Sequence, residues 1–512
     1  MISKDAIARG YNHGDYVVGA PTPPAYARSM TEIGKTAGLA RDPVIVPKPV
    51  LAQLEAIADR VQTAREDIVT QTRDWWSGTR ISETSGRPAV TEGAFVRVSR
   101  VEQVQEIMKL AFAHAIPVTA SAGRSNVTGA ALPLRGGIIL DLCGLNRFIG
   151  FDAGSQLAEV EAGIFGDVFE TVLQREHGVT MGHWPSSFGI STVGGWIACR
   201  GAGQLSTRYG KIEDMVHTLD VVLADGRLVT LGGYPRAATG PDLKQIFIGS
   251  EGTLGIIVRA RLRTHRLPDH ASALCFGFQS FAAGLEACRR IMQAGATPAV
   301  LRLYDALESG IQFDRPGTNV LLIADEGPEP IVSTCLELCR SICEEEGETL
   351  PAEAIFERWL DTRYATEKPA EGFTQTSGFV ADTLEMAGSW GCLPQIYDEV
   401  VAAINEVPGT LAGSAHQSHA YLEGACVYFS LRADIPPAHR EEWYRTVWKS
   451  VNDVLLRYRR DVTISHHHGV GLLRGPYMEP ALGEGFEVLR TIKKALDPRN
   501  ILNPGKMGFS LS

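Results

Sequence analysis

Three loops rich in glycine and hydroxyl side chains constrain the fold of this chain most strongly. They span residues 121–129, 185–196 and 249–258, and each lies next to an apolar run typical of a β-strand. Glycine lets the backbone approach a ligand closely, and serine or threonine hydroxyls add donors beside the exposed N–H groups. A tight turn explains one such loop equally well. Three in succession favour a domain wrapped around a large diphosphate or a flat heterocycle.

Two common nucleotide-binding motifs are missing from these loops. None of the three carries the Gly-Lys-Ser/Thr of a P-loop, and no Gly-x-Gly-x-x-Gly fingerprint follows the first expected strand, which begins at Phe95. The donors are instead spread over several loops, which indicates a ligand contacted from several directions.

Length and charge limit the class of protein. The chain has 512 residues, enough for two or three domains with a substantial core. A formal net charge of −10 argues against a general nucleic-acid-binding role, and no apolar run has the length of a membrane span. The first residues lack the apolar core of a signal peptide, so we expect a cytoplasmic protein.

Cys335, Cys339 and Cys343 recur every four residues, which favours a buried helix face over a metal site.

Hydrophobic periodicity predicts alternating strands and helices after an irregular lead-in. In the first part we expect helices at residues 49–61, 101–114 and 165–176, strands at 95–98, 116–120, 137–142 and 157–163, and a hairpin at 219–231. In the second part we expect helices at 281–294 and around the three cysteines, strands at 300–304, 319–324 and 425–432, and a loop at 361–378. We place the domains at 1–84, 85–268 and 269–512, in an α+β fold, because glycine density falls after residue 269.

Three consecutive histidines, His466 to His468, end an apolar run and precede Gly469. If this run is a strand, alternation places His466 and His468 on one face and His467 on the other. A lone histidine is commonly structural, but three at a strand end favour a functional role. Neutral imidazole accepts a proton near physiological pH, which suits a general base.

A second cluster contains His416, His419 and Tyr421 and precedes an alternating strand. On that strand Val427, Phe429 and Leu431 share a face that suits the core, so Tyr428 points the other way. A phenol there can hydrogen-bond a substrate oxygen or pass on a proton. A tyrosine at a sheet edge is the structural alternative.

Seven stretches in a fixed order resemble the flavoproteins of the vanillyl-alcohol oxidase and p-cresol methylhydroxylase type, above all the alkylglycerone-phosphate synthases and their bacterial relatives. The stretches are residues 191–196, 209–214, 239–242 and 249–255 in the first domain and 301–304, 424–429 and 465–471 in the second. The tail Asn503-Pro-Gly-Lys506 is also similar to the end of these flavoproteins.

The resemblance covers residues 90–507 and implies an enzyme that binds FAD. It implies a two-subdomain FAD-binding domain, an α+β cap domain with an antiparallel sheet, and a C-terminal tail that returns to the flavin. It places FAD against Ser121, Ala122, Gly123, Arg124, Ser125 and Asn126 (diphosphate), Pro185, Ser186, Ser187, Ser191, Thr192 and Gly195 (flavin and ribityl), and Glu251, Gly252 and Ile257 (adenosine). It assigns the chemistry to Tyr428 and His466, His467 and His468, with Arg302 near the active centre and His416 and His419 as further candidates.

Two departures from the family pattern bear on the flavin and on metals. The residues Ser121-Ala-Gly-Arg-Ser125 replace a Gly-Gly-Gly-Thr-Ser sequence and contain no histidine, so we expect no covalent flavin tether there, although attachment from the second domain stays open. The metal-associated motifs of related D-2-hydroxyacid dehydrogenases are missing, so we expect no metal. A zinc site at His416, His419 and His467 is the alternative.

A third departure concerns the substrate. The synthases carry an Arg-Asp pair shortly before the stretch that corresponds to residues 384–390, whereas residues 371–377 contain no arginine. Arg363 and Lys368 lie farther back. Because arginine is the usual phosphate clamp, we favour an oxidoreductase that transfers hydride from a small hydroxyl-bearing substrate to flavin N5. The alternatives are the redox-neutral exchange of acyl for alkyl through flavin N5, and a non-catalytic flavin-binding module. The resemblance implies a homodimer, and the electron acceptor stays open.

Overall fold

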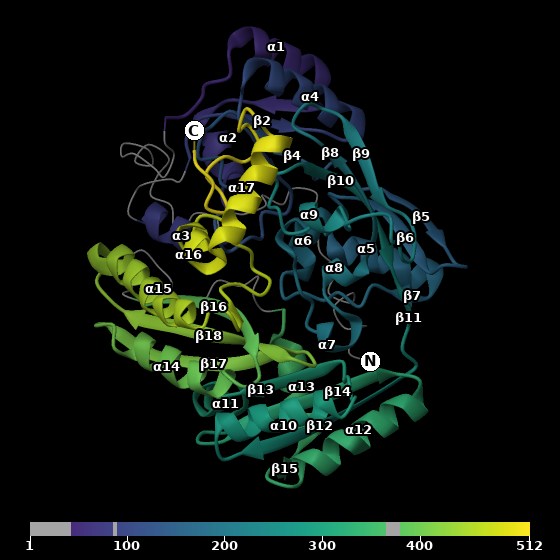
Figure 1. Cartoon of the computed structure of the whole chain (residues 1–512), viewed down its shortest axis with the longest axis vertical. Coiled ribbons are helices and arrows are strands. Elements are labelled where there is room, and N and C mark those ends of the chain that lie inside the picture. Colours follow the sequence, from purple (N-terminus) through teal and green to yellow (C-terminus); the bar gives the residue numbers. More distant parts are fainter. Residues whose placement is uncertain (1–41, 85–89, 365–378, 512) are drawn as a thin grey trace.

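The computed structural model describes residues 42–84, 90–364 and 379–511, so the expected lead-in over residues 1–41 lies outside the described residues. Two smaller sheets fill the upper half of Figure 1, and one large antiparallel sheet crosses the lower half. The fold is mixed helix and sheet, as predicted. No helix within the described ranges is long and apolar enough to cross a membrane.

The first sheet has four strands in the order β1-β2-β4-β3, of which β2, β4 and β3 are parallel. Its elements are α1 (Lys48–Ile57), β1 (Arg60–Gln62), α2 (Arg65–Gln71), α3 (Ser77–Thr84), β2 (Ala94–Arg97), α4 (Val101–His114), β3 (Val118–Ser121) and β4 (Ile138–Asp141). The predicted helix at 101–114 and the strands near 95, 116 and 137 are confirmed, whereas the helix expected at 49–61 ends at Ile57 and is followed by β1. The first glycine loop begins where β3 ends.

The second sheet is antiparallel, with five strands in the order β5-β6-β10-β8-β9. Its strands are β5 (Phe148–Asp152), β6 (Leu157–Glu161), β8 (Val216–Val222), β9 (Leu228–Gly232) and β10 (Ile256–Arg263). Nearby elements are α5 (Gly166–Val172), a π-helical turn (Leu173–His177), β7 (Val179–Thr180), α6 (Val193–Cys199), α7 (Ser206–Tyr209), α8 (Ile212–Met215), α9 (Lys244–Phe247) and β11 (His265–Arg266). The hairpin at 219–231 is confirmed, whereas β5 was not predicted.

The third sheet has eight strands in the order β15-β12-β14-β13-β17-β18-β16-β19, and its paired neighbours run antiparallel. The strands are β12 (His270–Phe278), β13 (Val300–Tyr304), β14 (Asn319–Gly327), β15 (Glu348–Leu350), β16 (Phe379–Ser389), β17 (Thr410–Ala420), β18 (Gly424–Asp434) and β19 (Val462–Thr463). The helices are α10 (Phe281–Gln293), α11 (Ala306–Phe313), α12 (Glu329–Cys343), α13 (Ala352–Thr362), α14 (Leu393–Asn405) and α15 (Arg440–Arg457). The cysteines lie on α12 as predicted, with Cys339 and Cys343 buried.

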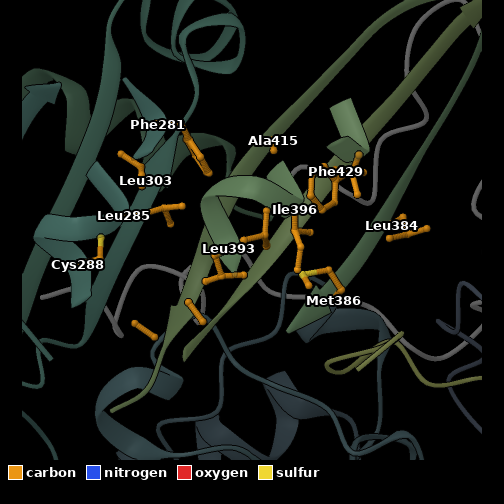
Figure 2. Close-up of a cluster of buried hydrophobic side chains, with 14 of the residues drawn as sticks. Phe281, Leu285, Cys288, Leu303, Leu384, Met386, Leu393, Ile396, Ala415 and Phe429 are labelled. Atoms are coloured by element: carbon orange, nitrogen blue, oxygen red, sulfur yellow. The ribbon is translucent and has the colours of Figure 1, made fainter. Parts of the chain in front are cut away.

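Strand alternation divides the large sheet into an apolar face and a polar face. Leu303, Ala415 and Phe429 point toward α10 and α14, where Figure 2 shows them packed with Phe281 and Ile396. The neighbours of these strand residues in sequence therefore point to the opposite face, toward the two smaller sheets. This alternation decides which side chains reach the space between the sheets.

The chain returns to the first sheet at its C-terminal end. After α16 (Met478–Leu482) and α17 (Glu484–Leu496), the carbonyl of Ile501 accepts a hydrogen bond from the backbone N–H of Val118 on β3 at 2.7 Å. Figure 1 shows this yellow segment beside the N-terminal elements. The tail therefore fixes the base of the first glycine loop.

Two expectations of local structure are wrong. The strand β19 ends at Thr463, so His466 to His468 lie in a bend and do not alternate between two faces of a strand. The loop expected at 361–378 begins later, because α13 continues to Thr362, and residues 365–378 lie outside the described residues. Both errors arise at element ends, where tertiary contacts outweigh local pattern.

Candidate active site

A cavity of about 640 Å³ lies between the glycine loops and the polar face of the large sheet. The residues predicted to hold the cofactor all line it. They are Ser121, Ala122, Gly123, Arg124, Ser125, Asn126, Pro185, Ser186, Ser187, Ser191, Thr192, Gly195, Glu251, Gly252 and Ile257. Of the predicted catalytic residues, Arg302, His416, His419, Tyr428, His467 and His468 line the same cavity, and His466 lies behind His467.

Close packing of backbone explains one of the glycines. A Cβ atom added to Gly123 would lie 2.5 Å from the carbonyl oxygen of Ile190, so only glycine lets the first loop approach the second. In the second loop, Thr192 caps α6 by accepting a hydrogen bond from the N–H of Gly195 at 3.3 Å. The two loops thereby form one continuous wall of the cavity.

Tyr428 projects from β18 into the cavity. Its hydroxyl is hydrogen-bonded to Nε2 of His467 and lies 3.3 Å from Nε2 of His468. Its ring stacks on the imidazole of His416, with centroids 4.8 Å apart. Burial raises the pKa of Tyr428 well above its ordinary value, so the side chain is a neutral phenol.

The three consecutive histidines turn toward one another instead of alternating. Nδ1 of His466 lies 2.8 Å from Nδ1 of His467, and Nε2 of His466 lies 2.6 Å from the hydroxyl of Tyr421. Burial lowers the pKa of His466 and His467 well below the ordinary value and lowers that of His468 to about 4. All three rings are therefore neutral near pH 7.

Two buried carboxylates hold the loop that carries these histidines. Glu385 on β16 accepts hydrogen bonds from the backbone N–H groups of His466 and His468, and Arg474 pairs with it at 3.2 Å. Glu251 accepts the N–H of Val470 at 2.5 Å and that of Gly471 at 2.8 Å. Glu251 lines the part of the cavity where the adenosine was expected. Its carboxylate, however, is already hydrogen-bonded to the backbone of the histidine loop.

Glu308 supports the other side of Tyr428. Its carboxylate lies 2.7 Å from Nδ1 of His416 and accepts hydrogen bonds from Ser414 at 3.0 Å and Ser430 at 2.5 Å. Burial alone would raise the pKa of Glu308, but His416, the Ser430 hydroxyl and Arg432 together lower it to about 2. Sequence reasoning missed Glu308, which lies outside every motif, and Glu385, whose only signal was its place in the stretch 384–390.

Among the described residues, the histidines could contribute to a metal site in two groupings, both different from the one considered from sequence. One is His419, His466 and His467, and the other is His467 with Glu385 and Cys426. Ring nitrogens of His419, His466 and His467 lie within 4.8 Å of one another, whereas His416 pairs with Glu308. Several of these nitrogens already have partners: Nδ1 of His419 lies 2.6 Å from the hydroxyl of Ser206, and the two Nδ1 atoms of His466 and His467 face each other. The hydrogen bonds account for the cluster without an ion.

Two arginines line the cavity. The guanidinium carbon of Arg302 lies 5.9 Å from the ring centroid of Trp359, and that of Arg363 lies 5.4 Å from the same centroid. Both residues line the cavity and both are buried. Arg363, discounted from sequence, therefore contributes a cation to the same space as Arg302.

Comparison with known proteins agrees with this arrangement. Residues 93–232 match the model of an FAD-binding domain, and residues 267–507 match that of the C-terminal domain of FAD-linked oxidases. An uncharacterized FAD-linked oxidoreductase of Escherichia coli, YgcU, is 30% identical over 427 residues, which cover 80% of this chain and 88% of that protein.

The chain belongs to the FAD-linked oxidoreductase family. Alkyldihydroxyacetonephosphate synthase of Dictyostelium discoideum is 28% identical over 79% of this chain and 71% of its own length. A solved structure of p-cresol methylhydroxylase with bound substrate superposes with a TM-score of 0.72, at 18% identity, over 92% of this chain and 99% of that one. The predicted resemblance and the fold type are thus confirmed.

The cavity suits the family's cofactor. Ser121 Oγ, Ser250 Oγ and both ring nitrogens of His183 are buried and have no hydrogen-bond partner among the described residues. Ser121 and His183 line the cavity, so their polar atoms are available to a bound ligand. The protein is therefore an FAD-dependent enzyme. When bound, FAD would supply the chemistry of its flavin ring.

Proposed function

We propose that this enzyme oxidises a small organic substrate that carries both a hydroxyl and an anionic group, and that hydride passes to N5 of FAD. The observation that carries the proposal is the neutral phenol of Tyr428, which faces the cavity and is hydrogen-bonded to the neutral imidazole of His467. The roles given to the predicted catalytic and FAD-contacting residues are part of this proposal.

The acid–base step follows from these protonation states. The carbon that bears the substrate's hydroxyl would give its hydrogen as hydride to bound FAD. The O–H proton of the substrate would then move to Tyr428, while the phenol proton of Tyr428 moves to Nε2 of His467. The phenol thus stays neutral, which its raised pKa favours. His416, held by Glu308, keeps the phenol ring stacked in place.

The anionic group of the substrate is inferred from Arg302 and Arg363. Two buried guanidinium groups in one cavity favour a carboxylate or phosphate, because arginine binds these groups through paired N–H donors. The second candidate function, exchange of acyl for alkyl on acyl-dihydroxyacetone phosphate, is favoured by the same two cations. In this second candidate function the substrate carries a phosphate group, like the substrate named for the synthase relative.

Anaerobic mixing with a panel of compounds tests the proposal. Glycolate, D- and L-lactate and glycerol 3-phosphate carry a hydroxyl and an anion, and ethylene glycol, 1,2-propanediol and glycerol are their neutral counterparts. We expect bleaching of the visible flavin band by at least one anionic compound and by none of the neutral ones. No bleaching by any hydroxyl compound, together with release of fatty acid from acyl-dihydroxyacetone phosphate and a fatty alcohol, would establish the second function instead.

This proposal carries forward a homodimer on the family resemblance, and a cytoplasmic location on the cysteines, which stay free in the described residues. Light scattering of the FAD-loaded protein measures the oligomeric state. Mixing the reduced enzyme with oxygen shows whether oxygen or another acceptor reoxidises the flavin, since an oxidase regains its colour within the turnover time.

A further inference from the structure

Four side chains form an unbroken hydrogen-bonded series that begins in the cavity. The hydroxyl of Tyr428 meets Nε2 of His467, whose Nδ1 lies 2.8 Å from Nδ1 of His466. Nε2 of His466 then lies 2.6 Å from the hydroxyl of Tyr421. Each histidine is engaged through both of its ring nitrogens, so both are in the middle of the series.

The two ends of this series lie in different environments. Tyr428 lines the cavity, whereas Tyr421 is partly exposed and lines a second hollow of about 340 Å³. The exposed residues Glu423, Arg460 and Asp461 border this second hollow. The series thus runs from the cavity to a residue that lines the second hollow.

We propose that Tyr428, His467, His466 and Tyr421 form a proton relay, called here the Tyr–His relay, that carries the substrate's hydroxyl proton from the cavity to the surface hollow. The proposal rests on the oxidation proposed above, because that reaction releases a proton next to Tyr428 in the cavity. It gives a role to His466, which does not itself touch the cavity.

One proton crosses the Tyr–His relay by five short transfers, the last of them to water. The substrate's O–H proton moves to Tyr428, and the phenol proton of Tyr428 moves to Nε2 of His467. The proton on Nδ1 of His467 moves to Nδ1 of His466, and the proton on Nε2 of His466 moves to Tyr421, which releases its own proton to water. No charge accumulates on any member, and the hydride leaves separately to FAD.

The surroundings keep both imidazoles in the neutral form that such a transfer needs. Burial is the main cause of their lowered pKa, and the positive Lys211, whose Nζ donates to the carbonyl of His466 at 2.7 Å, adds to it. Glu385 faces the backbone of the loop and is paired with Arg474. At the outer end, burial raises the pKa of Tyr421, and the carboxylates of Glu213 and Asp214 add to the shift, so this phenol is also neutral.

The protonation pattern is testable without any substrate. In the series, one of the facing Nδ1 atoms donates and the other accepts, so His466 and His467 must be opposite tautomers. Nitrogen NMR of isotope-labelled histidine in the FAD-loaded protein at neutral pH should show one ring protonated at Nδ1 and the other at Nε2. His466→Gln and His467→Gln variants assign the signals. Identical tautomers, an imidazolium at either ring, or a stoichiometric metal bound to them would overturn the relay.

The kinetic test removes the outer end of the relay. Tyr421→Phe should slow bleaching by the active panel compound on the order of tenfold and enlarge the solvent isotope effect, and concentrated imidazole buffer should restore the rate. Tyr458→Phe is the matched control, because Tyr458 also loses one hydroxyl hydrogen bond, to Glu399 at 2.7 Å, away from the cavity. Wild-type rates in Tyr421→Phe would overturn the relay. If no panel compound bleaches the wild type, the proposed function fails, and the tautomer measurement still decides the relay.

Discussion

The carboxylate of Glu385 lies under the histidine loop and accepts the backbone N–H of His468 at 2.9 Å. Burial alone would raise the pKa of Glu385, but Arg474, His468 and two backbone amides lower it overall, so the group is ionised. A buried anion on a strand of the large sheet therefore sets the conformation of a loop far along the chain.

Glu385→Gln is expected to lower stability on the order of 3 kcal/mol or more, because Arg474 would keep a buried charge without its anionic partner. Urea unfolding of the FAD-free protein measures this change. Glu399→Gln is the control, since the exposed pair of Glu399 with Arg457 should contribute about 1 kcal/mol or less. Equal losses in the two variants would contradict the structural role of Glu385.

Tyr428→Phe should keep FAD bound and slow flavin reduction by roughly a hundredfold to ten-thousandfold, because it removes the hydroxyl and keeps the stacked ring. Stopped-flow absorbance with the active panel compound measures the rate, and the flavin-to-protein ratio confirms binding. An unchanged rate would remove Tyr428 from the mechanism.

Asn503→Ala should weaken retention of FAD. The amide of Asn503 donates to the carbonyl of Ala130 at 2.9 Å and to that of Glu251 at 2.7 Å, so it ties the tail to two cavity loops. Each orphaned buried carbonyl costs roughly 1–3 kcal/mol. Flavin content after extensive dilution and gel filtration tests this, with Asn405→Ala, whose side chain bonds Gly413, as the control. Equal flavin content in both variants would show that the tail does not stabilise the site.

Acid should destabilise the FAD-free protein partly through His183. Burial lowers the pKa of His183 from 6.5 to about 3, so the folded state holds it neutral while the unfolded state protonates it. Its contribution to stability is present above pH 6.5 and is lost as the pH falls toward 3. Asp74 and Glu170, whose pKa values burial raises to about 7, act in the opposite direction.

Two variants measure the contribution of His183 to the pH dependence of stability. His183→Gln should flatten the fall of the thermal midpoint with decreasing pH, and the exposed His439→Gln should leave it unchanged. A wild-type slope in His183→Gln would mean that His183 is solvated or protonated in the folded state.

Much of the fold could be predicted because its signals are local. The helix from Val101 to His114 has its full apolar period in sequence, and the strand around Tyr428 alternates cleanly between Val427 and Phe429. β5 was missed because each of its residues is half-buried or exposed, so the strand has no clear alternation of apolar and polar residues. The histidine bend was misjudged because Glu251 and Glu385, remote in sequence, satisfy its backbone amides.

The sequence by itself determined the cavity-lining loops and the face on which Tyr428 lies, since glycine spacing, hydroxyl content and strand alternation are properties of short segments. The cofactor class came from the resemblance of several stretches to known flavoproteins. Only the tertiary structure decided how the histidines meet, that Glu308 and Glu385 support them, and that Arg363 shares the cavity with Arg302. These relationships join residues from different strands and loops. Their partners are chosen by packing and by the need to satisfy buried charge, which no local pattern records.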